Sequence, residues 1–487
     1  YTLAMAFSYS VDGGYTFKPM PGNFHGDHQT MWIDPKNPKR MFMGDDGGMN
    51  VTYDMGGAWK WFPNIPVGQF YQLSYDMREP FYHVSGGLQD NGTWTGPSRT
   101  RGGAIGQEAW RFIQGGDGYY AVSHPDDPEL FLSDLQAGGI VATNFRTFEQ
   151  REASPQPKRM DGYPADSNKV RFNWNAPIVK SPHDGKVVYF AGNILFKTTD
   201  WGKTWTAISP DLSKNDKSRQ GDAGGPILKE NTVAEYYGTI FSIEESPVKA
   251  GVIWVGTDDG NVQVTQDGGK TWTNVTGNIP GVGSDAVISA VEPSHAAAGT
   301  AYVGIERRMM DDLKPYVFKT TDFGKTWTNV TGNIPANAYV QVVREDPKNH
   351  NLVYVGTELG LFANWNGGSG DWTKLHLANL PNVAVHEIRV HPRENDLMVA
   401  THGRAIWILD DATPIQQMTK EIAAKPAHLF PVRTATRYNT GGGEWQWGSQ
   451  AFRGTNAPYG ATFTYWLKDK VADRKSTRLN SSHITIS

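Results

Sequence analysis

One octapeptide recurs along the chain and decides the fold. It reads SVDGGYTF at Ser10–Phe17, TYDMGGAW at Thr52–Trp59, TTDWGKTW at Thr198–Trp205, TQDGGKTW at Thr265–Trp272 and TTDFGKTW at Thr320–Trp327. The Asp carboxylate can accept backbone N–H groups two or three residues further on, and the Gly two positions later can take φ > 0 without a steric clash. Each copy therefore predicts a β-hairpin turn, whose final aromatic residue begins the returning strand and fills the gap between neighbouring sheets.

Strand-forming runs surround the octapeptides and set the length of the repeat. Upstream runs such as GVIWVGTDDGNVQV and NLVYVGTELGLF are typical of two strands joined by a tight turn, and phrases such as VREDPKNH end a further strand in a turn. The repeating unit is therefore four strands long. Asp12 and Asp54 are one unit apart, and the interval to Asp200 has room for three units of roughly 45 residues each. We count seven full units and a final one, VHEIRVHPRENDLMVATHGRAIWIL, that lacks an outer strand.

These units predict an all-β protein, with a β-propeller of seven or eight four-stranded blades over residues 1–412. Closure of the ring would pair the N-terminal hairpin with the last blade. Residues 413–450 are typical of a strap and a Gly-rich linker, and residues 451–474 of the start of a truncated β-sandwich-like domain. The final stretch, 475–487, abandons the patterns of the rest, and we expect it to be disordered.

The composition excludes several classes of function. The 487 residues include no Cys, which excludes disulfide frameworks, thiolate nucleophiles and Cys-ligated metals. The 46 basic and 50 acidic residues leave no net field that would attract polyanions, so a nucleic-acid partner is not expected. No apolar run approaches the roughly 18 residues that a membrane helix needs. We therefore expect no cofactor and no membrane span.

The octapeptides resemble Asp-box, or BNR, repeats. The phrases GDHQTMWIDP, GGLQDNGTWTGPS, RFNWNAPIVKSP, WTAISPDLS and ATHGRAIWILDD resemble those of the sortilin-like and xyloglucanase-like propeller proteins of bacteria, which are often named glycosyl hydrolases. The resemblance covers about residues 1–435. It implies an extracellular or periplasmic location and a longer protein, in which further blades or a second propeller accompany this segment.

Catalytic residues should be sought where the repeat does not explain the sequence. The octapeptide Asp residues form turns and are not candidates. Asp46 lies in the phrase GDDGG, in the slot where other units read TDDGN and TELGL, and xyloglucanase-like enzymes are similar in having a catalytic carboxylate in a TDxGG phrase. Inverting glycoside hydrolysis needs a second carboxyl group roughly 6.5–9.5 Å away, and Asp90 and Asp117 in adjacent blades are candidate partners. The alternative interpretation is that all three carboxylates cap glycine turns at blade edges.

Five further residues are candidates for substrate binding because they lie outside the repeat: His28, Trp94, Trp174, His402 and Arg404. The HGDH phrase around His28 could ligate a divalent ion, but ligands so closely spaced are more typical of a hydrogen-bonded turn, and we predict no metal. The last-unit loop with His402 and Arg404 could bind a sugar hydroxyl or a carboxylate, or could pair two blades. The two Trp side chains could stack on sugar rings or pack between blades.

Two functions remain open from the sequence. The first is a glycoside hydrolase-like propeller that acts on or binds a polysaccharide, with a carboxylate acid and base. The second is a non-catalytic, sortilin-like propeller that binds a peptide, a protein or a glycan.

Overall fold

The computed structural model describes residues 1–156, 162–234, 236–283, 285–377, 379–441, 448–469 and 484–485. The chain forms two compact units. The first comprises Tyr1–Val67, Arg99–Arg111 and Asn439–Asn456, and the second comprises Gly68–Ser98, Phe112–Tyr438 and Ala457–Ser487. Within the described residues, no helix is long and apolar enough to cross a membrane.

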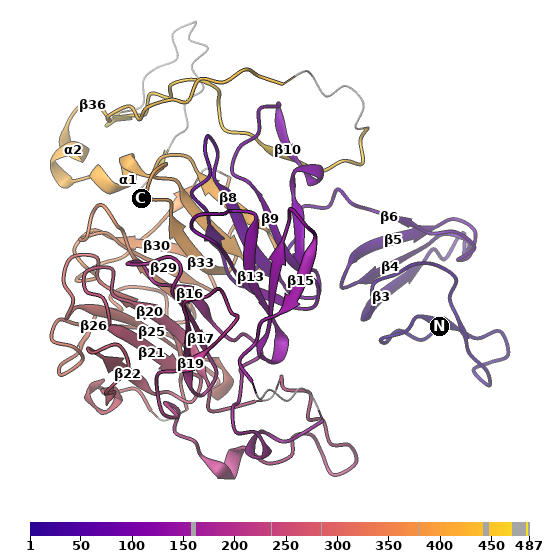
Figure 1. The fold of residues 1–487 in the computed structure, drawn as a ribbon. Helices are drawn as coiled ribbons and strands as arrows, with labels where there is room; N and C mark the ends of the chain where they lie inside the picture. Colours follow the sequence, from indigo (N-terminus) through magenta and orange to yellow (C-terminus); the bar gives the residue numbers. More distant parts are fainter. Residues whose placement is uncertain are drawn as a thin grey trace, which may run out of the picture. The chain divides into compact units, whose positions relative to one another are not determined.

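The first unit contains one complete four-stranded antiparallel sheet, which appears in indigo in Figure 1. Its strands are β3 (His28–Ile33), β4 (Met41–Asp45), β5 (Gly48–Thr52) and β6 (Lys60–Trp61). Two shorter pairings accompany it, namely β1 (Ser8–Tyr9) with β2 (Lys18–Pro19), and β10 (Ala104–Gly106) with β37 (Arg453–Thr455). Phe7, Met20 and Met43 are buried together and form a small core.

The described part of the second unit contains seven consecutive antiparallel sheets, which we number 1 to 7 (Figure 1). The first six have four strands each, and sheet 7 has three. In chain order, sheet 1 consists of β7 (Ser74–Tyr75), β8 (His83–Leu88), β9 (Gly92–Pro97) and β11 (Arg111–Gln114), and sheet 2 of β12 (Gly118–Ser123), β13 (Leu130–Leu135), β14 (Gly139–Asn144) and β15 (Glu149–Glu152). Sheet 3 consists of β16 (Ile178–Lys180), β17 (Val188–Ala191), β18 (Leu195–Thr198) and β19 (Thr206–Ala207), and sheet 4 of β20 (Ile240–Glu245), β21 (Ile253–Thr257), β22 (Val262–Thr265) and β23 (Thr273–Asn274). Sheet 5 consists of β24 (Val287–Pro293), β25 (Ala301–Arg307), β26 (Asp312–Thr320) and β27 (Thr328–Asn329), sheet 6 of β28 (Val340–Glu345), β29 (Val353–Thr357), β30 (Gly360–Asn364) and β31 (Thr373–Lys374), and sheet 7 of β33 (Val385–Val390), β34 (Leu397–Thr401) and β35 (Ile406–Leu409).

Sheet 7 packs against sheet 1. Phe70 and Tyr82, which flank β7, share an apolar core with Met398 and Ala400 of β34. The backbone N–H of Phe70 donates to the carbonyl of Thr401 at 3.2 Å. In the first unit β1 pairs with β2, and the expected pairing of this N-terminal hairpin with the last unit stays a prediction.

The first strands of sheets 2 to 7 line one pocket, together with Gln72, which lies just before the first strand of sheet 1. Buried ion pairs cross this pocket between sheets. Arg344 of β28 binds Glu387 of β33 at 2.7 Å and Glu292 of β24 at 3.2 Å, while Arg389 of β33 binds Glu244 of β20 at 3.0 Å. These five side chains therefore link sheets 4, 5, 6 and 7 through their first strands.

The octapeptides form the predicted turns, each between the third and fourth strands of a sheet or within the β1–β2 hairpin. In the copy of sheet 3, Asp200 Oδ1 accepts the N–H groups of Lys203 at 3.1 Å and Thr204 at 2.9 Å, and Gly202 takes φ +72°. The Trp205 indole N–H donates to the carbonyl of Ala153, which follows the last strand of sheet 2. In sheet 4 the Trp272 indole donates to the carbonyl of Ile208, which follows the last strand of sheet 3. These two octapeptides therefore both close a hairpin and tie their sheet to the preceding one.

Replacing Asp200 by Ala is expected to lower the free energy of unfolding by about 1 to 2 kcal/mol, because four hydrogen bonds to one carboxylate are lost in a single turn. Thr204→Val removes only one of them and should cost roughly half as much. Urea denaturation at pH 7 measures both values. Equal stability of the Asp200→Ala variant and the wild type would contradict this account of the turn.

The C-terminal residues of the second unit follow sheet 7. They form α1 (Thr413–Gln417), α2 (Lys420–Ala424) and the two-stranded pair of β36 (Ala427–Leu429) with β38 (Tyr465–Leu467). The expected sandwich-like start at 451–474 stays a prediction. The expected disordered tail at 475–487 lies outside the described residues, except that β39 (Ile484–Thr485) pairs with β32 (His376–Leu377). Six short 3-10 turns complete the described elements: Gln107–Ala109, Gln136–Gly138, Ala165–Ser167, Lys217–Arg219, Thr276–Asn278 and Arg308–Met310.

Candidate functional site

The polar residues that the repeat does not explain gather at one end of the sheets. Consecutive strands are antiparallel, so the turn from the second to the third strand lies at the same end of a sheet as the segment before the first strand. Asp90 and His402 lie in such turns, and Asp117 and Trp174 precede first strands. The octapeptide turns, which join third to fourth strands, lie at the opposite end. We call the first of these ends the polar end of the second unit.

Asp117 contacts two other predicted site residues. Its Oδ1 accepts the backbone N–H of Asp90 at 3.0 Å, and its Oδ2 accepts the indole N–H of Trp174 at 2.8 Å. The backbone N–H of Asp117 in turn donates to Gln136 Oε1 at 2.9 Å. Asp117 is only 8% exposed, so these donors replace most of its contact with water. The structure therefore brings Asp90, Asp117 and Trp174 together across sheets 1, 2 and 3.

Asp258, which the sequence analysis did not select, continues this cluster into sheet 4. Its Oδ1 accepts the backbone N–H groups of Gly238 at 3.0 Å and Thr239 at 2.8 Å. Its Oδ2 accepts the Thr239 hydroxyl at 2.6 Å and the Asn173 amide at 3.0 Å. Burial raises the pKa of Asp258 to about 7, although these hydrogen bonds act in the opposite direction. Asn173 directly precedes Trp174, so one dipeptide contacts both Asp258 and Asp117.

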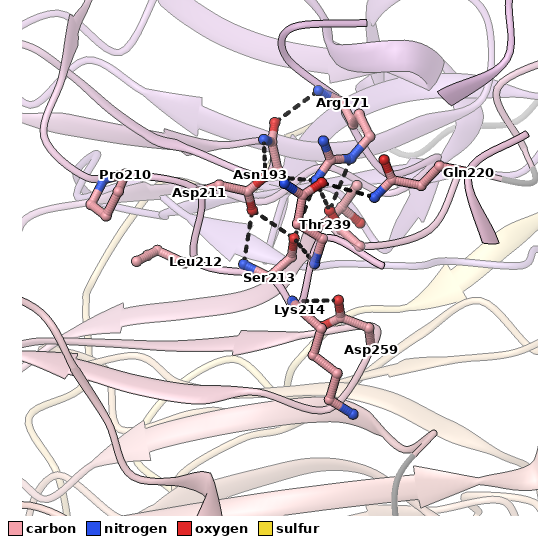
Figure 2. Close-up of polar contacts among 12 residues, drawn as sticks. Arg171, Asn193, Pro210, Asp211, Leu212, Ser213, Lys214, Gln220, Thr239 and Asp259 are labelled. Carbon is pink, nitrogen blue, oxygen red and sulfur yellow. Dashed lines mark hydrogen bonds and ion pairs between the residues drawn. The ribbon is translucent and has the colours of Figure 1, made fainter. Parts of the chain in front are cut away.

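A buried ion pair fixes the segment that carries this dipeptide (Figure 2). Arg171 is only 2% exposed, and its Nη2 binds Asp211 Oδ2 at 2.8 Å and the carbonyl of Gly238 at 3.0 Å. The backbone N–H of Arg171 donates to Asn193 Oδ1 at 2.8 Å. Burial opposes ionisation of Asp211, but hydrogen bonds from Ser213, Arg171 and Asn193 hold its pKa below the usual value. The charge of Arg171 is therefore fully paired inside the protein.

The loop from Pro210 to Lys214 connects this ion pair to Asp259, which follows Asp258 in the chain (Figure 2). Asp211 of the loop binds Arg171, and the backbone N–H of Lys214 donates to Asp259 Oδ2 at 2.7 Å. Asp259 is fully buried, and burial raises its pKa. One loop thus positions both the Asn173–Trp174 dipeptide and the Asp258 turn.

Asp46 and His28 belong to the first unit. Asp46 lies in the turn between β4 and β5, where its Oδ1 accepts the side-chain amide of Gln29 at 3.2 Å. His28 is buried, with its Nδ1 3.3 Å from Met43 Sδ and its ring 5.4 Å from that of Phe7. The described residues include no group of three or more His, Asp or Glu side chains arranged to hold a metal ion. The catalytic role of Asp46 and the binding role of His28 stay predictions.

Trp94, His402 and Arg404 lie in or beside turns at the polar end. The Trp94 indole donates to the carbonyl of Asn91 at 2.7 Å, so its N–H serves its own turn. The carbonyl of Arg404 accepts the indole N–H of Trp407 at 2.8 Å in the same way. The ring of His402 lies 4.8 Å from that of His386, and the resulting loss of contact with water lowers the pKa of His402. Substrate contacts of these three residues stay predictions.

Sequence comparison relates the chain to enzymes that act on xyloglucan. No family model matches it. An oligoxyloglucan-reducing end-specific xyloglucanase from Emericella nidulans is 28% identical over 231 residues, which is 45% of this chain and 25% of that protein. A probable enzyme of the same name from Neosartorya fischeri is 36% identical over 92 residues, which is 18% of this chain and 10% of that protein. The chain therefore spans a quarter or less of the length of these two relatives.

Two solved structures show weak likeness to the chain. The computationally designed protein Ika8 gives a TM-score of 0.40 with 10% identity, over 79% of this chain and 96% of that one. A GH74 enzyme from Niastella koreensis gives a TM-score of 0.29 with 14% identity, over 83% of this chain and 72% of that one.

Proposed function

We propose that this chain is part of a glycoside hydrolase that acts on a β-glucan of the xyloglucan kind. In this proposal the seven sheets of the second unit form a closed seven-bladed β-propeller, and the polysaccharide lies across its polar end. The contact of sheet 7 with sheet 1 and the shared central pocket support closure. The sequence similarity to xyloglucanases supports the substrate class. Because such a polymer is found outside the cell, we expect an extracellular or periplasmic protein.

The observation that carries the proposal is the pair of buried carboxyl groups of Asp117 and Asp258, joined through Asn173 and Trp174. Glycoside hydrolysis needs one carboxylic acid to protonate the leaving oxygen and one carboxylate to act as base or nucleophile. The pKa of about 7 keeps a large fraction of Asp258 protonated at neutral pH, which suits the acid. Asp117 is then the carboxylate, and the ring of Trp174, whose indole N–H binds Asp117, is a surface for a sugar ring.

The proposal also assigns roles to the other two predicted carboxylates, Asp90 and Asp46. Asp90 donates its backbone N–H to Asp117 and so fixes the orientation of that carboxylate. Asp46 occupies, in the GDDGG turn of the first unit, the slot that Asp258 occupies in the TDDGN turn of sheet 4. We propose that Asp46 serves a corresponding site on the first unit. A second propeller in the whole protein would provide the opposite wall for either site.

The test is an assay of reducing-end release from xyloglucan, other β-glucans and sialosides with the purified chain. Asp117→Asn should reduce turnover of the preferred β-glucan at least about 100-fold. Asp126→Asn is the matched control, since Asp126 is an exposed, ion-paired carboxylate at the opposite end of sheet 2. Asp46→Asn shows whether the first unit contributes to turnover, and Asp90→Asn shows whether the side chain next to the Asp117 carboxylate does. Turnover that Asp117→Asn leaves unchanged, or binding of a peptide without hydrolysis of any glycan, would overturn the proposal.

A further inference from the structure

A second polar cluster lies at the polar end of sheets 5, 6 and 7, and the proposed hydrolysis does not use it. Glu306 is the penultimate residue of β25, Arg308 lies in the turn to β26, and Tyr339 precedes β28. Glu358 lies in the turn between β29 and β30, and His402 in the turn between β34 and β35. By the topology that places Asp117 and Asp258, these side chains belong to the same end of the second unit.

A buried carboxylate holds the guanidinium of this cluster. Arg308 Nε lies 2.5 Å from Glu306 Oε1, and the side chain of Glu306 is 5% exposed whereas that of Arg308 is 51% exposed. The Arg308 guanidinium carbon also lies 5.7 Å from the ring centroid of Tyr339. Arg308 is therefore held on one side by Glu306 and against one aromatic ring, while half of its side chain remains open to solvent.

An acceptor lies next to this donor. The Tyr339 hydroxyl donates to Glu358 Oε2 at 2.7 Å, and Glu358 is partly exposed. Burial lowers the pKa of His386 to about 3 and also lowers that of His402, so both of these neighbouring imidazoles are neutral at pH 7. The Glu306–Arg308 pair is neutral as a unit. The cluster thus has hydrogen-bond donors and acceptors in close proximity, and no surplus of positive charge for an anionic ligand.

We propose that Arg308, Glu358 and His402 form a second sugar-binding subsite, which holds adjacent hydroxyl groups of a neutral sugar unit in the same polysaccharide. This inference rests on the proposed function. It adds a binding role for sheets 5, 6 and 7, whereas Asp117 precedes sheet 2. A sugar hydroxyl both donates and accepts, so a pair of hydroxyls needs a fixed donor beside a fixed acceptor, as Arg308 and Glu358 provide. Met309 and Met310, 82% and 51% exposed in the same turn, offer an apolar surface for the C–H face of the sugar.

Glu358→Gln and Tyr339→Phe test this subsite, because both substitutions leave the buried Glu306–Arg308 pair intact. In the active chain each is expected to raise KM for xyloglucan oligosaccharides about tenfold while kcat changes less than about twofold. In an Asp258→Asn background, where hydrolysis is suppressed, calorimetric titration with the same oligosaccharides should show the same weakening of Kd. Glu421→Gln, an exposed carboxylate of α2, is the matched control, and thermal unfolding of every variant checks the fold.

The outcomes separate this inference from the proposed function. Unchanged KM and Kd in both variants, together with loss of turnover in Asp117→Asn, would overturn the subsite and leave the hydrolase. Tighter binding of polygalacturonate than of xyloglucan oligosaccharides, lost in the Glu358→Gln variant, would show an anionic ligand and overturn the neutral-sugar assignment. Absence of both binding and hydrolysis of every neutral β-glucan by the wild type would overturn both proposals.

Discussion

Replacing Asp258 by Asn is expected to reduce kcat for β-glucan hydrolysis about 1,000-fold, with little change in KM. The amide keeps the shape of the carboxyl group, and its oxygen can still accept the N–H groups of Gly238 and Thr239. It cannot donate a proton to the leaving oxygen. Reducing-end assays over a range of substrate concentrations separate the two constants. A kcat within about tenfold of the wild type would remove Asp258 from the role of acid.

The pH dependence gives an independent readout of the same residue. Because burial raises the pKa of Asp258 to about 7, the wild-type kcat should fall as the pH rises through 7, and the residual activity of the Asn variant should lack this fall. The free energy of unfolding should also depend on pH through the carboxyl group of Asp258. A carboxyl whose pKa is raised on folding favours the folded state below its unfolded pKa, and that advantage disappears as the pH rises through about 7. The loss in the free energy of unfolding is at most about 4 kcal/mol and should be absent in the variant.

Replacing Arg171 by Met is expected to lower the free energy of unfolding by about 3 to 5 kcal/mol, the largest effect on stability that we expect from one substitution. The substitution leaves the Asp211 carboxylate without its charge partner and the carbonyl of Gly238 without a donor. It also frees the segment with Asn173 and Trp174, so hydrolysis should fall together with stability. Arg171→Lys retains the charge but loses the paired Nε and Nη2 donors to the carbonyl of Gly238, so its stability should fall between those of the wild type and Arg171→Met.

Arg146→Met provides the matched control for Arg171. Arg146 also binds an Asp, but its side chain is 59% exposed, so its loss should leave the free energy of unfolding close to that of the wild type. Urea denaturation of the three variants and the wild type gives the comparison. Equal effects of the Arg171 and Arg146 substitutions would mean that the buried pair does not support the fold.

The repeat could be predicted from the sequence because its determinants are local. The octapeptide turn depends on an Asp, a Gly and their near neighbours, and the hydrogen bonds of Asp200 span at most four residues. Seven complete four-stranded sheets and a final three-stranded one occur in the described residues, in agreement with the seven full units and one incomplete unit expected. The packing of sheet 7 on sheet 1 could not be predicted from the sequence, because it depends on apolar contacts between distant segments rather than on turn chemistry.

The candidate site could be predicted only in part for the same reason. Asp117 was selected as a residue outside the repeat, but its link to Trp174 joins positions 57 residues apart and has no local signature. Asp258 stands in the same turn slot as Asp46, so its phrase TDDGN was a signal that could have been followed. Its distinguishing property is burial beneath Asn173 and Thr239, which depends on neighbouring sheets. Arg171 gave no signal, since nothing in the sequence pairs it with Asp211.

The contact between sheets 7 and 1 has a consequence for the synthesis of the protein. Tyr82 meets Asp396 at 3.1 Å, although 314 residues separate them in the sequence. A ribosome must therefore translate nearly all of the second unit before the apolar side chains of β8 find their permanent neighbours. Until then these side chains are available to other nascent chains, and contacts of such long range form slowly. Chaperones that shelter hydrophobic segments during translation should therefore determine how much of this protein reaches its native state in cells.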